Sequence, residues 1–308
     1  MKYYGDYGCG AEILPQPVSV TMECEIGVPA DKLNVVFSCV IPQLRMIYMC
    51  DGDFSRDNII FIGYVDVQKT DISQSGITVT IEARSPASLP LDSDCESGQY
   101  TDPASDIMFE EHLKAFGITN GSEITCADGA LNIPKGESHY GAVERFCTTL
   151  CNTTPRIDSL GVFFVDAYRD DEKEIIFENG AGISFSRVEH TKRRSALVSS
   201  VIVNSGGRVC VCTDDSAVND GIVRERRLDL SCTLTGTLAD ADRIIESGRQ
   251  NSEQVRLWCS GYLGDILGMR AKVRGLGSVD INGQLYIASV KYNENKNEQI
   301  TIVNLNCK

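Results

Sequence analysis

Alternating apolar and polar residues over positions 18–91 predict a run of β-strands. In "VSVTMECEI" every second side chain is apolar, which is the period of a strand with one buried face. "KLNVVFSCVI" and "LRMIYMC" continue the run, and "DGDFSRDN" predicts a turn. "FIGYVDVQKTDISQSGITVTIEARS", residues 61–85, predicts two strands around a polar linker. Ile60, Ile62 and Tyr64 make the other face of the first of these strands apolar too, so it is either central or lies against another chain.

The pattern changes after the breaker-rich linker "SPASLPLDSDCESGQYTDPAS". "SDIMFEEHLKAFGI" has helical spacing, with Ser105 or Asp106 as the cap and Gly117 at the end. "SHYGAVERFCTTLCN" predicts a second helix, and "GVFFVDAYRDDEKEIIFENG" predicts a β-hairpin with a charged tip. These segments predict an α+β insert of two helices and a hairpin.

Strand patterns return from about Ser195 with "ALVSSVIVNS", "RVCVCT" and "RLDLSCTLTG". "LADADRIIESGRQNSEQV" predicts a helix, within which Gly248 is a candidate end. The chain finishes with "MRAKVRGLG", "QLYIASVKYNEN" and "EQITIVNLN", and this last pair repeats the order strand, polar linker, strand. We therefore predict a β-rich α+β fold. Two related β-barrel domains, residues 1–92 and 191–308, flank the α+β insert at 93–190.

Charge and composition narrow the classes of function that the chain can have. The chain of 308 residues has 43 acidic and 29 basic residues, a formal charge of −14. Basic residues cluster only at 192–194 and 224–227, so binding of nucleic acid through its phosphates is disfavoured. The start of the chain lacks the apolar core of a signal peptide, and no run of about 18 apolar residues exists. We therefore expect no membrane segment, synthesis in the cytoplasm, and 13 cysteines present as reduced thiols.

The sequence predicts no catalytic residue. The three histidines, His112, His139 and His190, are not accompanied by a Gly-x-Ser-x-Gly elbow, and no cysteine stands in a recognised nucleophile context. Nucleophilic catalysis needs a base within reach of the nucleophile. An unrecognised hydrolase therefore stays an alternative only if one of these histidines meets a nucleophile in a pocket.

No metal or cofactor site is predicted either. Cys147 and Cys151 share a helix face, and Cys210 and Cys212 share a strand face, but both pairs lack the Cys-x-x-Cys spacing of zinc sites. Buried thiols are the favoured interpretation. "DGDFSRDN" begins like a calcium loop but lacks the glycine and glutamate that an EF-hand requires. "GLG" and "GYLGDILG" have no phosphate-loop context.

The order of the segments resembles that of a known family. "FIGYVDV" followed by "GITVTIEARSPASLPLD" resembles a strand, linker and strand ending in Arg-Ser with a following Leu and Asp. "IMFEEHLKAFGI" resembles a helix ending in Phe-Gly-Ile, "GESHYGAVERFCTTLCNTTPRIDSLGVFFV" a second helix and strand, and "RRSALVSSVIVNS" the strand that reopens a second β domain. In this order they resemble the baseplate hub proteins of contractile phage tails. That late-control-D-like family includes the N-terminal part of VgrG spikes and the hubs of defective prophages.

The resemblance implies a structural protein that is not an enzyme. Hubs of this family form trimers in which each subunit contributes two similar β-barrels to a ring with approximate sixfold symmetry. Such a homotrimer would join the tail tube protein to the spike protein among other baseplate proteins. DNA would pass through its lumen without specific binding. The resemblance also implies assembly in the bacterial cytoplasm and a place in the tail of a virion, a tailocin or another contractile injection system.

On this interpretation the functional residues form contact surfaces. The predicted subunit or tube contacts are two strand faces, around Ile60, Ile62 and Tyr64, and around Tyr286, Val290 and Tyr292. The alternative is that these are core residues. A carbohydrate- or receptor-binding β module is the other function considered, and it would need an exposed aromatic platform, for which Trp258 is the only tryptophan.

Overall fold

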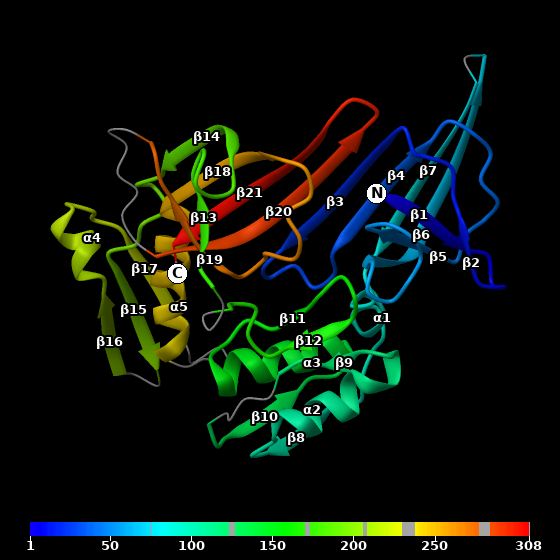
Figure 1. Ribbon diagram of the computed structural model, residues 1–308. Helices are drawn as coiled ribbons and strands as arrows, with labels where there is room; N and C mark the ends of the chain where they lie inside the picture. The colour runs from blue at the N-terminus through cyan, green and yellow to red at the C-terminus, as the bar shows by residue number, and fades with distance from the viewer. Residues whose placement is uncertain are drawn as a thin grey trace. The chain divides into compact units, whose positions relative to one another are not determined.

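The chain divides into two compact units in a β-rich fold with few helices (Figure 1). The computed structural model describes residues 1–74, 76–122, 127–169, 173–205, 208–229, 238–276 and 284–307. Unit 1 comprises Met1–Asp171, Ser260–Gly268 and Ser289–Ile302, and unit 2 comprises Glu172–Cys259, Met269–Ala288 and Val303–Lys308. The β-rich α+β class is confirmed. The three-part division at 92 and 190 stays a prediction.

Unit 1 is built on an antiparallel sheet. Its strands are β1 (Lys2–Asp6), β2 (Ala11–Ile13), β3 (Ser19–Glu25), β4 (Lys32–Phe37), β5 (Met46–Cys50), β6 (Ile59–Ser73), β7 (Gly76–Arg84) and part of β20 (Leu285–Asn295). They run in the order β20-β3-β4-β7-β6-β5-β1-β2. The run of strands predicted over 18–91 is confirmed, whereas β1 and β2 were not predicted. The alternation on β3 sends Val20, Met22 and Cys24 into the core, because neighbouring side chains on a strand point to opposite faces.

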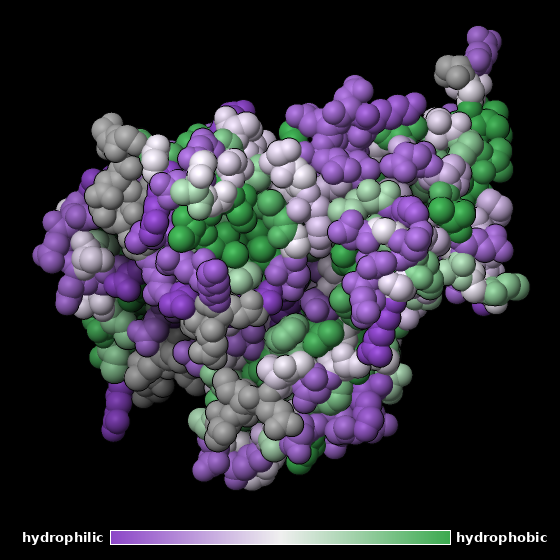
Figure 2. Space-filling model, viewed as in Figure 1, coloured by the Kyte–Doolittle hydropathy of each residue, from purple (hydrophilic) through white to green (hydrophobic). Residues whose placement is uncertain are grey.

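The hairpin of β6 and β7 extends past the strands that flank it. The two strands pair as far as Ser73 and Gly76, but β5 pairs with β6 only up to Tyr64. On the inner part of the hairpin Val79 is fully buried, whereas Ile72 near the end is 76% exposed. Hydrophobic residues are visible along this extension (Figure 2). The turn "DGDFSRDN" joins β5 to β6, as predicted for a hairpin turn.

The insert of unit 1 contains the two predicted helices. Its elements are α1 (Ser88–Leu91), β8 (Gly98–Thr101), α2 (Ser105–His112), the short 3-10 helix η1 (Lys114–Phe116), β9 (Thr119–Asn120), β10 (Ala130–Ile133), α3 (His139–Phe146), the π-helical turn η2 (Cys147–Cys151), β11 (Arg156–Ile157) and β12 (Val162–Phe164). Met108, Leu113, Val143 and Phe146 are buried in the shared core. The predicted helix is divided: α2 ends at His112 with Leu113 as its C-cap, and Gly117, with a positive φ of 76°, ends the 3-10 helix η1 that follows.

Two local predictions in the insert region were wrong. Neither Ser105 nor Asp106 caps α2, because its N-cap residue is Ala104, which makes no side-chain capping bond. Residues 161–180 do not form a hairpin. β12 pairs with β11 and β9, while β13 (Ile175–Phe177) belongs to unit 2 and pairs in parallel with β19 (Arg270–Val273). β12 pairs with the neighbouring β11, but its other partner β9 and the partner of β13, β19, lie far away in the sequence, which a local pattern does not reveal.

Unit 2 combines short sheets with one long helix. Its remaining elements are β14 (Phe185–Lys192), β15 (Ser200–Ser205), β16 (Arg208–Thr213), α4 (Asp215–Asn219), β17 (Glu225–Asp229), α5 (Leu238–Ser252), β18 (Glu253–Ser260) and part of β21 (Gln299–Cys307). β16, β15 and β17 form a sheet in that order, and Val201 and Val203 of β15 are buried with Ala241 and Ile245 of α5. Gly248 does not end α5. A Cβ there would lie 2.9 Å from the Ala196 carbonyl oxygen, so the glycine permits close packing. The predicted strand pattern at 230–236 lies outside the described residues.

Candidate functional site

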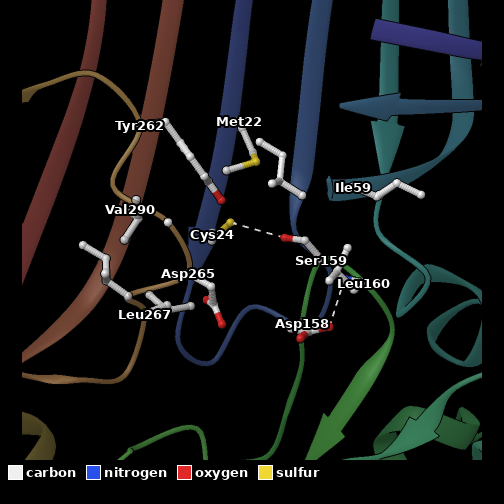
Figure 3. Close-up of a pocket in the computed structure, with 13 residues that line it drawn as sticks. Met22, Cys24, Ile59, Asp158, Ser159, Leu160, Tyr262, Asp265, Leu267 and Val290 are labelled. Atoms are coloured by element: carbon white, nitrogen blue, oxygen red, sulfur yellow. Dashed lines mark hydrogen bonds between the residues drawn. The ribbon is translucent and has the colours of Figure 1, made fainter. Parts of the chain in front are cut away.

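A largely apolar pocket of about 180 Å³ lies in unit 1. Its walls come from β3, the start of β6, the loop before β12, the segment 262–267 and β20 (Figure 3). The lining residues are Met22, Cys24, Ile59, Ile60, Asp158, Ser159, Leu160, Tyr262, Gly264, Asp265, Ile266, Leu267 and Val290. Leu160 is 42% exposed, so apolar surface remains accessible beside the pocket. The size suits one apolar side chain or a small apolar molecule.

A buried polar network borders this pocket. The Ser159 hydroxyl donates a 2.6 Å hydrogen bond to Asp31 Oδ2, and its oxygen lies 3.8 Å from Cys24 Sγ (Figure 3 shows the second contact). The backbone N–H of Asp31 donates to the Ser85 hydroxyl at 3.0 Å. The network therefore ties the loop before β12 to β3, to the residue before β4 and to the end of β7.

A buried arginine extends the network. Arg156 on β11 is 7% exposed and forms a 3.0 Å ion pair with Asp265, which Arg169 also contacts at 3.0 Å. A buried charge is tolerated only when it is paired, because its desolvation costs several kcal/mol. The pair therefore anchors the segment 262–267 to the insert.

Burial decides the protonation of the groups around the pocket. It raises the pKa of Asp31 to about 6, although the positive charge of Arg156 and the bond from Ser159 act in the opposite direction. Burial also raises the pKa of the Cys24 thiol well above its usual value. A thiol that stays protonated is a poor nucleophile, and the partner of Ser159 is a carboxylate rather than an imidazole. The arrangement suits a structural connection better than catalysis.

None of the three histidines lines this pocket. His112 and His139 face each other, with 3.2 Å between their Nδ1 atoms, and Tyr100 lies 3.2 Å from Nε2 of His112. Burial lowers the pKa of both imidazoles, and for His112 the neighbouring His139 adds to that effect. In unit 2, His190 pairs with Glu253 at 2.7 Å. These contacts connect the histidines to one another, to a tyrosine and to a carboxylate, so the geometry gives the hydrolase alternative no support.

The two cysteines of each predicted pair lie in different surroundings. Cys147 is a buried free thiol, whereas Cys151 is disulfide-bonded, so the expectation of reduced thiols throughout fails at that residue. Cys210 is exposed, whereas Cys212 packs against the core between β15 and α5. Within the described ranges, no group of three or more His, Cys, Asp or Glu side chains is arranged to hold a metal ion.

The predicted contact residues fall into two classes. Ile60, Ile62 and Tyr64 on β6 are half-buried, whereas Tyr286, Val290 and Tyr292 on β20 are 4%, 4% and 0% exposed. The β20 residues therefore pack inside the chain, as the core alternative expects. Ile60 and Val290 both line the pocket. A contact role stays a prediction, and Ile60, Ile62 and Tyr64 are the residues with surface left to make it.

The polar network beside the pocket rests on residues that the sequence did not indicate. Asp31, Arg156, Ser159 and Asp265 are single polar residues that no motif connects. Only the fold brings them together from positions more than 100 residues apart. An alignment that showed paired substitutions at these positions would be a signal able to reveal them.

Comparison with known structures identifies the fold. A tail protein from Neisseria meningitidis MC58 superposes with a TM-score of 0.76 and 13% identity, over 99% of this chain and 96% of that one. The 43 kDa tail protein of prophage MuSo2 from Shewanella oneidensis superposes with a TM-score of 0.73 and 14% identity, over 99% and 97% of the two chains. The chain has the fold of phage tail proteins. A third similar structure, E. coli c3393, is described as a type VI secretion component with structural similarity to the phage T4 tail proteins gp27 and gp5. It matches with a TM-score of 0.55 and 9% identity, over 94% of this chain and 73% of its own.

The resemblance inferred from short motifs is thus confirmed at the level of the fold. Searches against protein-family models and curated proteins find no match. At identities of 9–14% the likeness lies in the backbone and not in the sequence. Among the described residues, no helix is long and apolar enough to span a membrane.

Proposed function

We propose that this chain is the structural baseplate hub of a phage or phage-like contractile tail. Three copies would form a ring with approximate sixfold symmetry that joins the tail tube to the central spike. The observation that carries the proposal is the superposition on two tail proteins over nearly the whole length of both chains. The insert and both units are therefore covered by the likeness, and not only one common sheet.

The two units fit the proposal of two related β-barrel domains. Unit 1 holds an antiparallel sheet to which β20 contributes Ser289–Asn295. Unit 2 holds β14 paired with β18, and β19 paired with β20. In an assembled ring the domains would alternate around a lumen through which DNA passes without specific binding.

Exposed apolar strand residues also favour an assembly. Ile72 at the end of the β6–β7 hairpin is 76% exposed, and Val209 and Val211 on β16 are 66% and 56% exposed. Exposed apolar strands aggregate unless another element or chain covers them. A protein that works inside a baseplate, in a virion or in a related injection system, would have them covered by its neighbours.

The glycan-binding alternative loses its main candidate residue. The Arg187 guanidinium lies 4.4 Å from the centre of the Trp258 ring. A sugar would need that ring face open to stack on it. The half-buried, arginine-covered tryptophan therefore favours a protein contact over a carbohydrate platform.

Binding to the tail tube and spike proteins of the same tail tests the proposal. The purified chain is mixed with each protein and the products are separated by size, with the tube protein of an unrelated tail as the control. We expect stable complexes with the matching tube and spike proteins, visible as rings on tubes by electron microscopy. A chain that binds neither the tube protein nor the spike protein would contradict the hub function.

A further inference from the structure

Charge is divided very unequally between the two units. Unit 1 contains 29 acidic and 13 basic residues, a difference of −16, while unit 2 contains 14 acidic and 16 basic residues, a difference of +2. Two copies that met through their acidic units would repel each other. A contact between unit 1 of one copy and unit 2 of another avoids that repulsion.

Unit 2 presents a cationic surface suited to such a contact. On β18 the residues Val255, Leu257 and Cys259 point into the core, so Arg256 and Trp258 lie on the outward face. Arg187 is paired with Trp258 across the two strands and lies over its ring. Together with Arg193, these residues form what we name the Arg-Trp surface: Arg187, Arg193, Arg256 and Trp258.

The side chains of the Arg-Trp surface are held in place. Arg256 Nε donates a 2.8 Å hydrogen bond to Asn304, and Arg193 donates at 2.8 Å to Gln254. Arg187 is also held by Glu189 on the same strand, yet its side chain remains 61% exposed. Arginine and tryptophan are enriched where protein partners bind, and a guanidinium that is already positioned loses less entropy on binding. The Arg-Trp surface is therefore suited to bind carboxylates.

Unit 1 carries a matching acidic surface on α2. Asp106, Glu110 and Glu111 are exposed there around Ile107, which is itself 45% exposed. Of these carboxylates, Lys114 pairs only with Glu110, with 2.5 Å between Nζ of the lysine and Oε2 of the glutamate. Ile107 flanked by carboxylates complements Trp258 flanked by arginines, both in charge and in apolar character. We name these four residues the α2 acidic surface.

We propose that the Arg-Trp surface of one copy binds the α2 acidic surface of the next copy, and that this contact orders the ring head to tail. The inference rests on the proposed function, in which the two units would alternate around the ring and unit 2 of each copy would meet unit 1 of its neighbour. Contacts of this heterologous type close a ring when the rotation between copies fits. Charge then excludes the arrangement in which acidic units meet.

The test is the strength of the trimer in charge-reversed variants. Sedimentation velocity measures the trimer dissociation constant at low and high salt, with tube and spike proteins added if the ring closes only on them. The double variant Arg187→Glu with Arg256→Glu should weaken the trimer at least about tenfold at low salt. The matched control Arg208→Glu with Arg226→Glu changes the charge of unit 2 equally at two other exposed arginines, and should have much less effect.

Restoration by a second reversal identifies the partner surface. Adding Glu110→Lys and Glu111→Lys to the weakened variant should recover most of the lost affinity, with circular dichroism confirming that each variant is folded. Equal effects of the two arginine pairs, or no recovery, would overturn the inference while leaving the hub function intact. Weaker binding to spike or tube with an unchanged trimer would also overturn it, because the occupant would be that protein. Absence of any trimer, even with tube and spike, would instead refute the proposed function on which the inference rests.

Discussion

Replacing Asp31 by asparagine should remove a pH dependence from the stability of the protein. Burial raises the pKa of this carboxyl from 3.8 to about 6, so the folded state binds the Asp31 proton more tightly than the unfolded state. Stability from this group is therefore fully present below pH 3.8 and is lost as pH rises through about 6. A shift of roughly two units corresponds to about 3 kcal/mol, since each unit is worth about 1.4 kcal/mol. Asparagine keeps an acceptor for the Ser159 hydroxyl but cannot ionise.

Urea denaturation at several pH values between 4 and 8 measures this effect. The free energy of unfolding of Asp31→Asn, minus that of the original protein, should increase by roughly 2.5 kcal/mol from pH 4 to pH 8, because a small part of the full effect is already lost at pH 4. The exposed Asp57→Asn serves as the matched control and should show no such trend. The same pH dependence in the original protein and in Asp31→Asn would refute the role assigned to the buried carboxyl.

Three further substitutions test the packing of unit 1. Gly268→Ala should destabilise the fold by more than about 2 kcal/mol, because its φ is +81° and a Cβ there would collide with a backbone oxygen. The matched control Gly264→Ala has the same φ, but its Cβ would meet open space, so it should cost only about 1 kcal/mol. Tyr3→Phe should cost about 1–2 kcal/mol in urea denaturation by removing its 2.5 Å hydrogen bond to the buried Glu294, and an unchanged midpoint would contradict this. Arg156→Ala should cost about 1–3 kcal/mol because it removes the positive charge beside the buried Asp31, while Asp265 keeps its contact with Arg169, and an unchanged urea midpoint would show the pair to be dispensable.

Local patterns were sufficient for most of the regular structure. Period-two alternation identified β3 and β4, because one face of each strand packs on the core and the other does not. Helical spacing identified α2 and α3 for the same reason. The order of these elements then supported the resemblance to tail hubs, and the superposition on tail proteins confirmed the fold.

Long-range pairing is what the sequence left open. β12 and β13 are short apolar runs with a charged link between them, which is also the pattern of a hairpin. They separate because β13 pairs with β19, nearly 100 residues further along the chain. The network around Asp31 was not predicted for the same reason, since no local sequence motif marks its partners Ser159 and Arg156. On β20 the residues Tyr286, Val290 and Tyr292, for which contact and core roles were both open, are buried within the chain, and a contact role stays a prediction.

The oligomeric mass of the purified chain tests the hub proposal most directly. Light scattering across a range of concentrations is measured for the chain alone and after mixing with the tube and spike proteins of its tail. A hub predicts a trimer of about 101 kDa, three times the 33.7 kDa chain, alone or on these partners. A chain that remains at 33.7 kDa and ignores both partners would contradict the account.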